Sequence, residues 1–184
     1  MVKKRATRYK KHKRNRRRTQ RGGSAAVVGL LDNADGVPLA TPPPPDVNMI
    51  VKFGPTSSKT ASDFGNTIKI EESQPQPHVH WKEPPAGTLY TLLCWDPDAQ
   101  AKSWLHWLVV NCKDTTPEDG TTLQEWSPPS PPKGSGLHRY IFALFKQTGA
   151  LTIGAPTQAG FHVQNFATQN GLTPLAYKGM RVNA

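Results

Sequence analysis

Two nearly continuous apolar runs, residues 88–95 and 104–111, constrain the fold of this chain more than any other feature. A strand with one solvated face alternates apolar and polar residues, whereas a strand buried on both faces is apolar at almost every position. The two runs therefore predict central strands of a sheet that is covered on both sides.

Shorter β-type segments, punctuated by Gly and Pro, surround these runs. The chain holds 18 prolines, which are unfavourable in helix interiors and which here separate many short strands. This pattern predicts a mostly β, antiparallel β-sandwich with one or two short helices rather than a helical domain. Further strands are expected at 48–53, 67–70, 78–81, 121–126, 139–146 and 175–182, and a short helix at 161–170.

The charge distribution divides the chain into a tail and a folded part. The net charge is +10, yet the residues outside the first 23 hold 23 − 12 = 11 basic against 13 acidic residues. We therefore expect a disordered basic arm at 1–23, a Pro-rich linker at 24–46 and one domain at 47–184. The arm's cationic residues are Lys3, Lys4, Arg5, Arg8, Lys10, Lys11, Lys13, Arg14, Arg16, Arg17, Arg18 and Arg21.

A run of this kind binds nucleic-acid phosphates by counter-ion release, and those twelve residues are the predicted nucleic-acid contacts. An import signal, an anionic membrane surface and a solvated tail are the alternatives. Apart from the initial methionine, Tyr9 and Val2 are the only bulky apolar residues in the arm, so it lacks the anchors of an interfacial helix.

The sequence also bounds the compartment. Cys94 and Cys112 are too few for a disulfide framework and lie in apolar runs, where buried free thiols are expected. No apolar stretch reaches the ~20 residues that span a bilayer, and no apolar segment follows the basic residues as in a signal peptide. We expect an intracellular protein, nuclear or nucleolar, that is not an integral membrane protein; packaging in a virion or another nucleoprotein particle is the alternative.

Three polar clusters adjoin the predicted central strands: residues 96–98 (DPD), 104–111 (WLHWLVVN) and 131–140 (PPKGSGLHRY). They supply imidazoles, carboxylates, a phenol and a glycine-rich loop that can turn backbone N–H groups toward an anion. Histidines that change charge near neutral pH suit a phosphate group. A histidine that only satisfies a buried hydrogen bond is the competing interpretation at each position.

Together the three clusters resemble the phosphatidylethanolamine-binding protein family, over roughly residues 47–182. The resemblance implies a β-sandwich with a small anion pocket, a role in binding phosphate or phospholipid head groups and partner proteins, and no enzymatic activity or cofactor. It places the ligand-binding positions at Asp96, Asp98, His106, Pro132, His138 and Tyr140, and the pocket rim at Trp126, Gly134 and Gly136.

Other readings of these residues remain open. After Asp98 the chain reads AQAK, where the family usually has APSR, which alters one wall of the expected pocket. His78 and His80 alternate on one strand, but no third metal ligand follows at a characteristic spacing, so no metal site is predicted. Ser135 and His138 lie close together without the G-x-S-x-G motif of a hydrolase. The fold could also be reused as a structural component of a large nucleic-acid-containing assembly.

Overall fold

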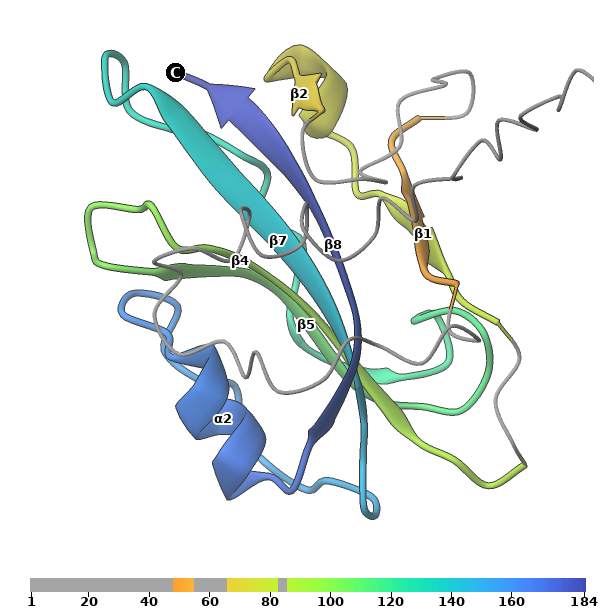
Figure 1. The fold of residues 1–184 in the computed structure, drawn as a ribbon. Helices are drawn as coiled ribbons and strands as arrows, with labels where there is room; N and C mark the ends of the chain where they lie inside the picture. The colour runs from red at the N-terminus through yellow and green to blue at the C-terminus, as the bar shows by residue number, and fades with distance from the viewer. Residues whose placement is uncertain (1–47, 55–65, 83–85) are drawn as a thin grey trace, which may run out of the picture.

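The computed structural model describes residues 48–54, 66–82 and 86–184, which form a six-stranded sheet and a separate two-stranded sheet (Figure 1). The basic arm and the linker expected at 1–46 lie outside the described residues. The strand order in the larger sheet is β2-β8-β7-β4-β5-β6, and β1 pairs with β3. The elements are β1 Ile50–Lys52, β2 Thr67–Ile68, the 3₁₀ helix η1 Glu71–Ser73, β3 His78–His80, β4 Tyr90–Asp96, β5 Trp104–Cys112, β6 Thr121–Gln124, β7 Leu137–Lys146, α2 Val163–Gln169 and β8 Thr173–Asn183.

The predicted mostly β sandwich is confirmed, and each predicted strand matches an observed strand to within a few residues. One pairing differs from the expected antiparallel pattern: β2 runs parallel to the C-terminal strand β8, over Thr67↔Arg181 and Ile68↔Val182. The chain turns into η1 directly after β2, so this parallel contact is two residues long. The other strand pairs within the described residues are antiparallel.

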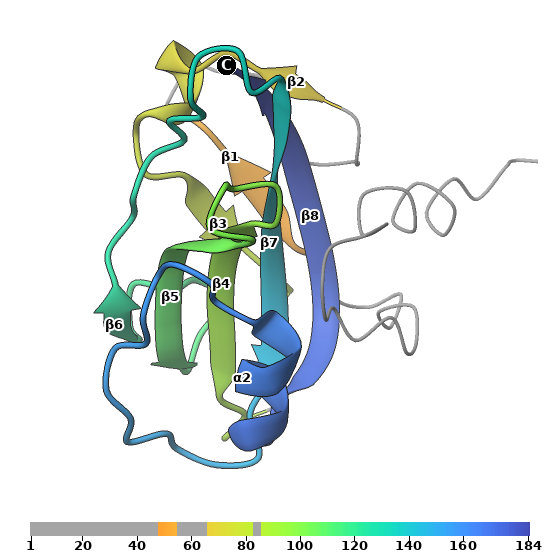
Figure 2. The same ribbon diagram turned by 90° about the vertical axis from the view of Figure 1, so that its left-hand side faces the viewer.

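The central strands are buried on both faces, as the apolar runs predict. Along β4, Leu92 and Cys94 belong to a core shared with β1 and β3, while Leu93 and Trp95 belong to a second core shared with α2. Figure 2 shows α2 on one side of the large sheet and the β1–β3 pair on the other. Every residue of β4 is buried, which explains why that segment shows no polar alternation.

Both cysteines lie in this core as free thiols, which confirms their predicted burial. Burial raises the pKa of Cys94 well above that of an ordinary thiol, and the nearby Asp96 charge raises it further. Burial likewise raises the pKa of Cys112, to about 12. The thiolate is the reactive form, so neither side chain is an accessible nucleophile near neutral pH.

No helix within the described residues is long and apolar enough to cross a bilayer.

Candidate functional site

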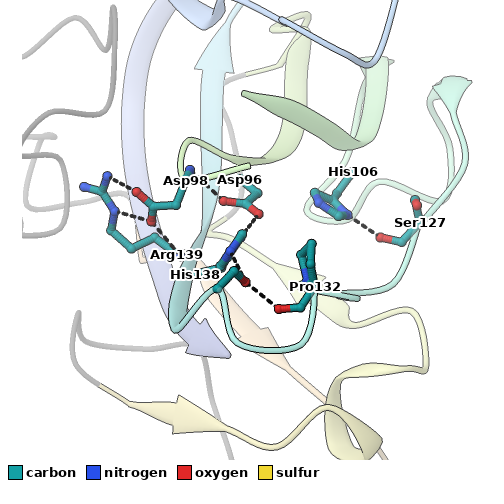
Figure 3. Close-up of polar contacts among 8 residues, drawn as sticks. Asp96, Asp98, His106, Ser127, Pro132, His138 and Arg139 are labelled. Atoms are coloured by element: carbon teal, nitrogen blue, oxygen red, sulfur yellow. Dashed lines mark hydrogen bonds and ion pairs between the residues drawn. The ribbon is translucent and has the colours of Figure 1, made fainter. Parts of the chain in front are cut away.

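Ionisable side chains gather at the end of the large sheet where β4 ends and where β5 and β7 begin (Figure 3). Because β4 pairs antiparallel with both neighbours, its last residue lies beside the first residues of each. We call this group the histidine cluster; its members are Asp96 from β4, His106 from β5, Ser135 from the loop before β7, and His138 and Tyr140 from β7.

A β-bulge sets the direction of His106. Cys94 pairs with Trp107 and Trp95 pairs with Leu105, so His106 is an extra residue on β5 with no partner on β4. A bulge breaks the strict alternation of side chains and can redirect one of them. His106 consequently contacts aromatic residues on the same face as Trp107, with its ring centroid 4.9 Å from that of Tyr140.

His106 is 6% exposed and carries one unused ring nitrogen. Its Nδ1 lies 2.6 Å from the carbonyl oxygen of Ser127, and a carbonyl only accepts, so Nδ1 carries the proton. In the neutral ring Nε2 is then a lone-pair acceptor, and no described residue bonds to it. Burial lowers the pKa of His106, although the Ser127 carbonyl and the Asp96 charge oppose that effect. The ring is thus held neutral with Nε2 available.

His138 connects the buried carboxylate to the loop. Its Nδ1 lies 2.7 Å from Oδ2 of Asp96, and its Nε2 lies 2.9 Å from Oγ of Ser135. Asp96 and His138 are each 3% exposed, while Ser135 is exposed. Burial raises the pKa of Asp96, but its hydrogen bond and ion pair with His138 oppose the rise. The contact with His138 therefore favours the ionised form of the buried Asp96 carboxyl group.

The loop at residues 132–136, the glycine loop, is held by its own backbone. Ser135 N–H donates to the Pro132 carbonyl at 3.0 Å, and the Ser135 hydroxyl lies 2.7 Å from the same oxygen. Gly134 and Gly136 both have φ of 84°, a conformation that favours glycine. A Cβ built on either would meet nothing within 4 Å, so the space beside both is open. Within the described part of the chain, neither glycine N–H has an acceptor.

Asp98 is oriented away from the two imidazoles. Its carboxylate accepts from Arg139 Nε at 2.7 Å, from Nη2 at 2.6 Å and from the backbone N–H at 3.0 Å. Partial burial raises the pKa of Asp98, but the Arg139 hydrogen bonds and charge outweigh it and leave the pKa below its ordinary value. Asp98 N–H also donates to Asp96 Oδ1 at 2.7 Å, so this turn fixes the buried carboxylate.

Tyr140 and Trp126 border the cluster on its aromatic side. Burial and the Asp96 charge raise the pKa of Tyr140, so its phenol stays protonated at physiological pH. Trp126 is half-buried with its ring 6.4 Å from that of His106, and its Nε1 donates to the Gln74 carbonyl at 3.1 Å. Trp126 therefore lies beside the cluster, where a pocket rim was expected.

The structure thus brings Asp96, His106, His138 and Tyr140 together, with Pro132, Gly134 and Gly136 in the adjoining loop. It places Asp98 on Arg139. Two groups that orient the site residues were not predicted. The Ser127 carbonyl bonds to His106, and a backbone carbonyl leaves no signal in the sequence. Arg139 bonds to Asp98, and it could have been noticed because it directly follows His138 in the sequence. The sequence predicts no role for Ser135, because no recognisable motif surrounds it.

The two other histidines considered above, His78 and His80, are both exposed on β3. In the parts of the chain that the structure describes, no group of three or more His, Cys, Asp or Glu residues could hold a metal ion.

Comparison with known proteins identifies the family. The family model described as phosphatidylethanolamine-binding protein matches residues 57–180, and the chain belongs to this family. A "26 kDa secreted antigen" of Toxocara canis is 31% identical over 150 residues, covering 74% of this chain. The matched region spans only 56% of that relative's own length.

Two solved structures share the fold. A carboxypeptidase Y inhibitor, solved in complex with its cognate proteinase, has a TM-score of 0.73 and 23% identity, covering 86% of this chain and 92% of its own. A phosphatidylethanolamine-binding protein from Plasmodium vivax has a TM-score of 0.70 and 21% identity, covering 87% and 96%. At these identities the likeness concerns the fold alone.

Proposed function

We propose that the histidine cluster binds a phosphate-type anion, either free phosphate or the head group of a phospholipid. The observation that carries the proposal is the Nε2 of His106, which has no described partner at a residue that is only 6% exposed. This atom is not among the fully buried unpaired atoms of the described residues, so a ligand can reach it from solvent. An accessible ring nitrogen on a largely buried histidine, beside a second imidazole, suits a ligand atom.

The surrounding groups suit an anion with several oxygens. Gly134 and Gly136 supply backbone N–H groups without described acceptors, and Tyr140 supplies a protonated phenol nearby. His138 is already oriented by Asp96, and in its imidazolium form its Nε2 would donate to a ligand oxygen in place of the contact with Ser135. A phosphate would bind together with a proton on His106, because Nε2 donates only in the imidazolium form.

Titration by calorimetry or NMR with phosphate, phosphoethanolamine and ethanolamine tests the proposal and distinguishes its two sources. Binding of both phosphates but not of ethanolamine indicates an anion site, and tighter binding of phosphoethanolamine favours a lipid head group. Absence of binding by either phosphate up to about 10 mM, well above the ~1 mM range of weak complexes, would refute the proposal.

Two substitutions of one residue provide a matched pair. His106→Asn keeps an amide N–H near the position of Nδ1, where it can donate to Ser127, and removes Nε2. His106→Gln retains a donor near Nε2 instead. A charge-assisted hydrogen bond contributes about 1.5–3 kcal/mol, so we expect His106→Asn to weaken phosphate binding about tenfold or more and His106→Gln to weaken it less.

We further propose that the basic arm tethers this domain to nucleic acid. The support is its charge: twelve cations and no acidic residue between Lys3 and Arg21, against a slightly acidic remainder. Replacing the twelve cations by Gln in the full chain should abolish binding to duplex or structured RNA. Wild-type binding should fall steeply as salt rises. Equal affinity in the two proteins would exclude the tether, and with it the reason to propose a nuclear location or a place in a nucleoprotein particle.

The structural alternative, in which the fold is reused as a component of a large assembly, makes a different prediction for the cluster. A structural component needs no ligand, so RNA binding by the arm without any phosphate binding at His106 would favour it. Both properties in one protein would favour a tethered binding module.

A further inference from the structure

We propose that Ser135, His138 and Asp96 form a catalytic triad that hydrolyses small carboxylic esters through an acyl intermediate on Ser135. This activity goes beyond anion binding and does not depend on it. Serine nucleophiles are activated when a base lies within hydrogen-bond reach and a third group orients that base. The three residues are ordered in this way, although the sequence around Ser135 does not match the known hydrolase motif.

The distances fit the three roles. Ser135 Oγ lies 2.9 Å from Nε2 of His138, and Nδ1 of His138 lies 2.7 Å from Oδ2 of Asp96. Asp96 and His138 are both buried, so the orienting pair is shielded from water. Ser135 is exposed at the tip of the glycine loop, where a substrate can reach it. A buried relay ending in an exposed hydroxyl is the arrangement that a nucleophile requires.

The Ser135 hydroxyl has two acceptors within reach. Its oxygen lies 2.7 Å from the Pro132 carbonyl and 2.9 Å from His138 Nε2. A serine carries one hydroxyl hydrogen, which rotates about the Cβ–Oγ bond. Turning that hydrogen from Pro132 to His138 needs no movement of a heavy atom, and it produces the serine-to-histidine hydrogen bond from which the proton is transferred.

The glycine loop also provides an oxyanion donor. In hydrolases built on a glycine-flanked serine, the N–H of the residue after the nucleophile donates to the developing oxyanion. Here that residue is Gly136, whose N–H bonds to no acceptor in the described residues. A Cβ at Gly134 or Gly136 would meet no atom within 4 Å, so the loop is open on either side of Ser135.

The reaction balances without a further reagent. Ser135 Oγ bonds to the ester carbonyl carbon while its proton passes to His138 Nε2. The tetrahedral intermediate collapses by breaking the bond to the alcohol oxygen, and His138 returns the proton to the departing alcohol. Water then attacks the acyl-serine by the same route, which yields the carboxylic acid and restores Ser135.

Labelling of the full-length wild-type protein with a fluorophosphonate, followed by peptide mapping, tests the proposal directly. The expected result is a single modified residue, Ser135. His138→Asn keeps an N–H directed toward Asp96 but removes the base, and it should slow labelling by about a hundredfold or more, the usual contribution of a general base. Ser130→Ala is the matched control, because Ser130 is an exposed serine on the same connection whose hydroxyl bonds to no described residue.

Hydrolysis of p-nitrophenyl acetate gives the second readout. We expect turnover in the wild-type protein and in Ser130→Ala, and none above background in Ser135→Ala. An unlabelled Ser135, a label elsewhere, or full turnover in Ser135→Ala would each overturn the triad. The mapping uses the wild-type chain, so it remains decisive even if a variant fails to fold. Phosphate binding without labelling would leave the anion site intact and exclude the esterase.

Discussion

The large sheet carries a buried polar group at each end, and the two differ in how completely they are satisfied. At the end opposite the histidine cluster lies the amide network, built from Thr91, Asn111 and Gln147 with the backbone of Gly149 and Leu151. Gln147 Oε1 accepts from Thr91 and from Asn111 N–H, while its Nε2 donates to Asn111 and Gly149, all within 2.9 Å. Asn111 in turn exchanges two hydrogen bonds with the backbone of Leu151, each of 2.8 Å.

The amide network is neutral and internally complete, whereas the histidine cluster is ionisable and incomplete. Every side-chain donor and acceptor of Gln147 has a partner, but His106 Nε2 and two glycine N–H groups have none among the described residues. Complete neutral networks stabilise a fold, and incomplete titratable ones are typical of ligand sites. The comparison supports our proposal that one end of the sheet serves stability and that the other end binds a ligand.

The largest expected effect lies at the amide network. Gln147→Leu removes four hydrogen bonds and leaves unpaired polar groups on the buried Thr91 and the half-buried Asn111. Each such group costs about 1–3 kcal/mol, so we expect a loss of roughly 2–4 kcal/mol in the free energy of unfolding, measured by denaturant titration. Phosphate binding by the folded protein should not change. A variant as stable as the wild type would show that the network is not structural.

A smaller effect is expected from His106 as the pH falls. Its pKa is lowered in the folded state, so stability is fully present above the ordinary histidine pKa of about 6.5 and decreases as pH falls through the folded value. The loss is about 1.4 kcal/mol for each unit by which the pKa is lowered. Denaturant titrations between pH 7.5 and 5 should show a flatter pH dependence in His106→Asn. His78→Asn, at an exposed site on β3, is the control; equal slopes in all three proteins would contradict the account.

The smallest effect is expected at Asp98. Its side chain is 29% exposed and bonded to Arg139, and partly exposed ion pairs contribute about 0.2–1 kcal/mol. Because the pKa of Asp98 is lowered, this stability is present above about pH 4 and is lost as the carboxylate is protonated at lower pH. Asp98→Asn should therefore lower the thermal midpoint slightly at pH 7 and not at pH 2.5. A decrease of equal size at both pH values would show that the ion pair is not the cause.

Much of the fold could be predicted from the sequence, because a strand buried on both faces is apolar at almost every position. Residues 88–95 are apolar at nearly every position, and β4, which overlaps them, is buried between both cores. The parallel contact of β2 could not be predicted, since it depends on where the C-terminal strand runs. Two residues of pairing leave no periodicity to detect.

The site was predictable in its residues but not in its geometry. The clusters around Asp96, His106 and His138 could be located from their order along the chain. The bulge that directs His106 arises from the pairing of β5 with β4, and the role of Ser127 depends on a backbone carbonyl, which carries no sequence information. The hydrogen-bonded series Ser135–His138–Asp96 could not be predicted, because no known hydrolase motif surrounds Ser135. Its two short contacts are visible only in the folded structure.

The most direct test of the anion site is the titration of the His106 ring, followed by NMR of the wild-type protein with and without phosphate. Burial lowers the pKa of His106 in the free protein, and a bound anion would stabilise the imidazolium beside Asp96 and His138. The account predicts that about 10 mM phosphate raises the pKa of His106, and that the same concentration of chloride does not. An unchanged His106 titration in phosphate would contradict the central claim that the histidine cluster is a ligand site.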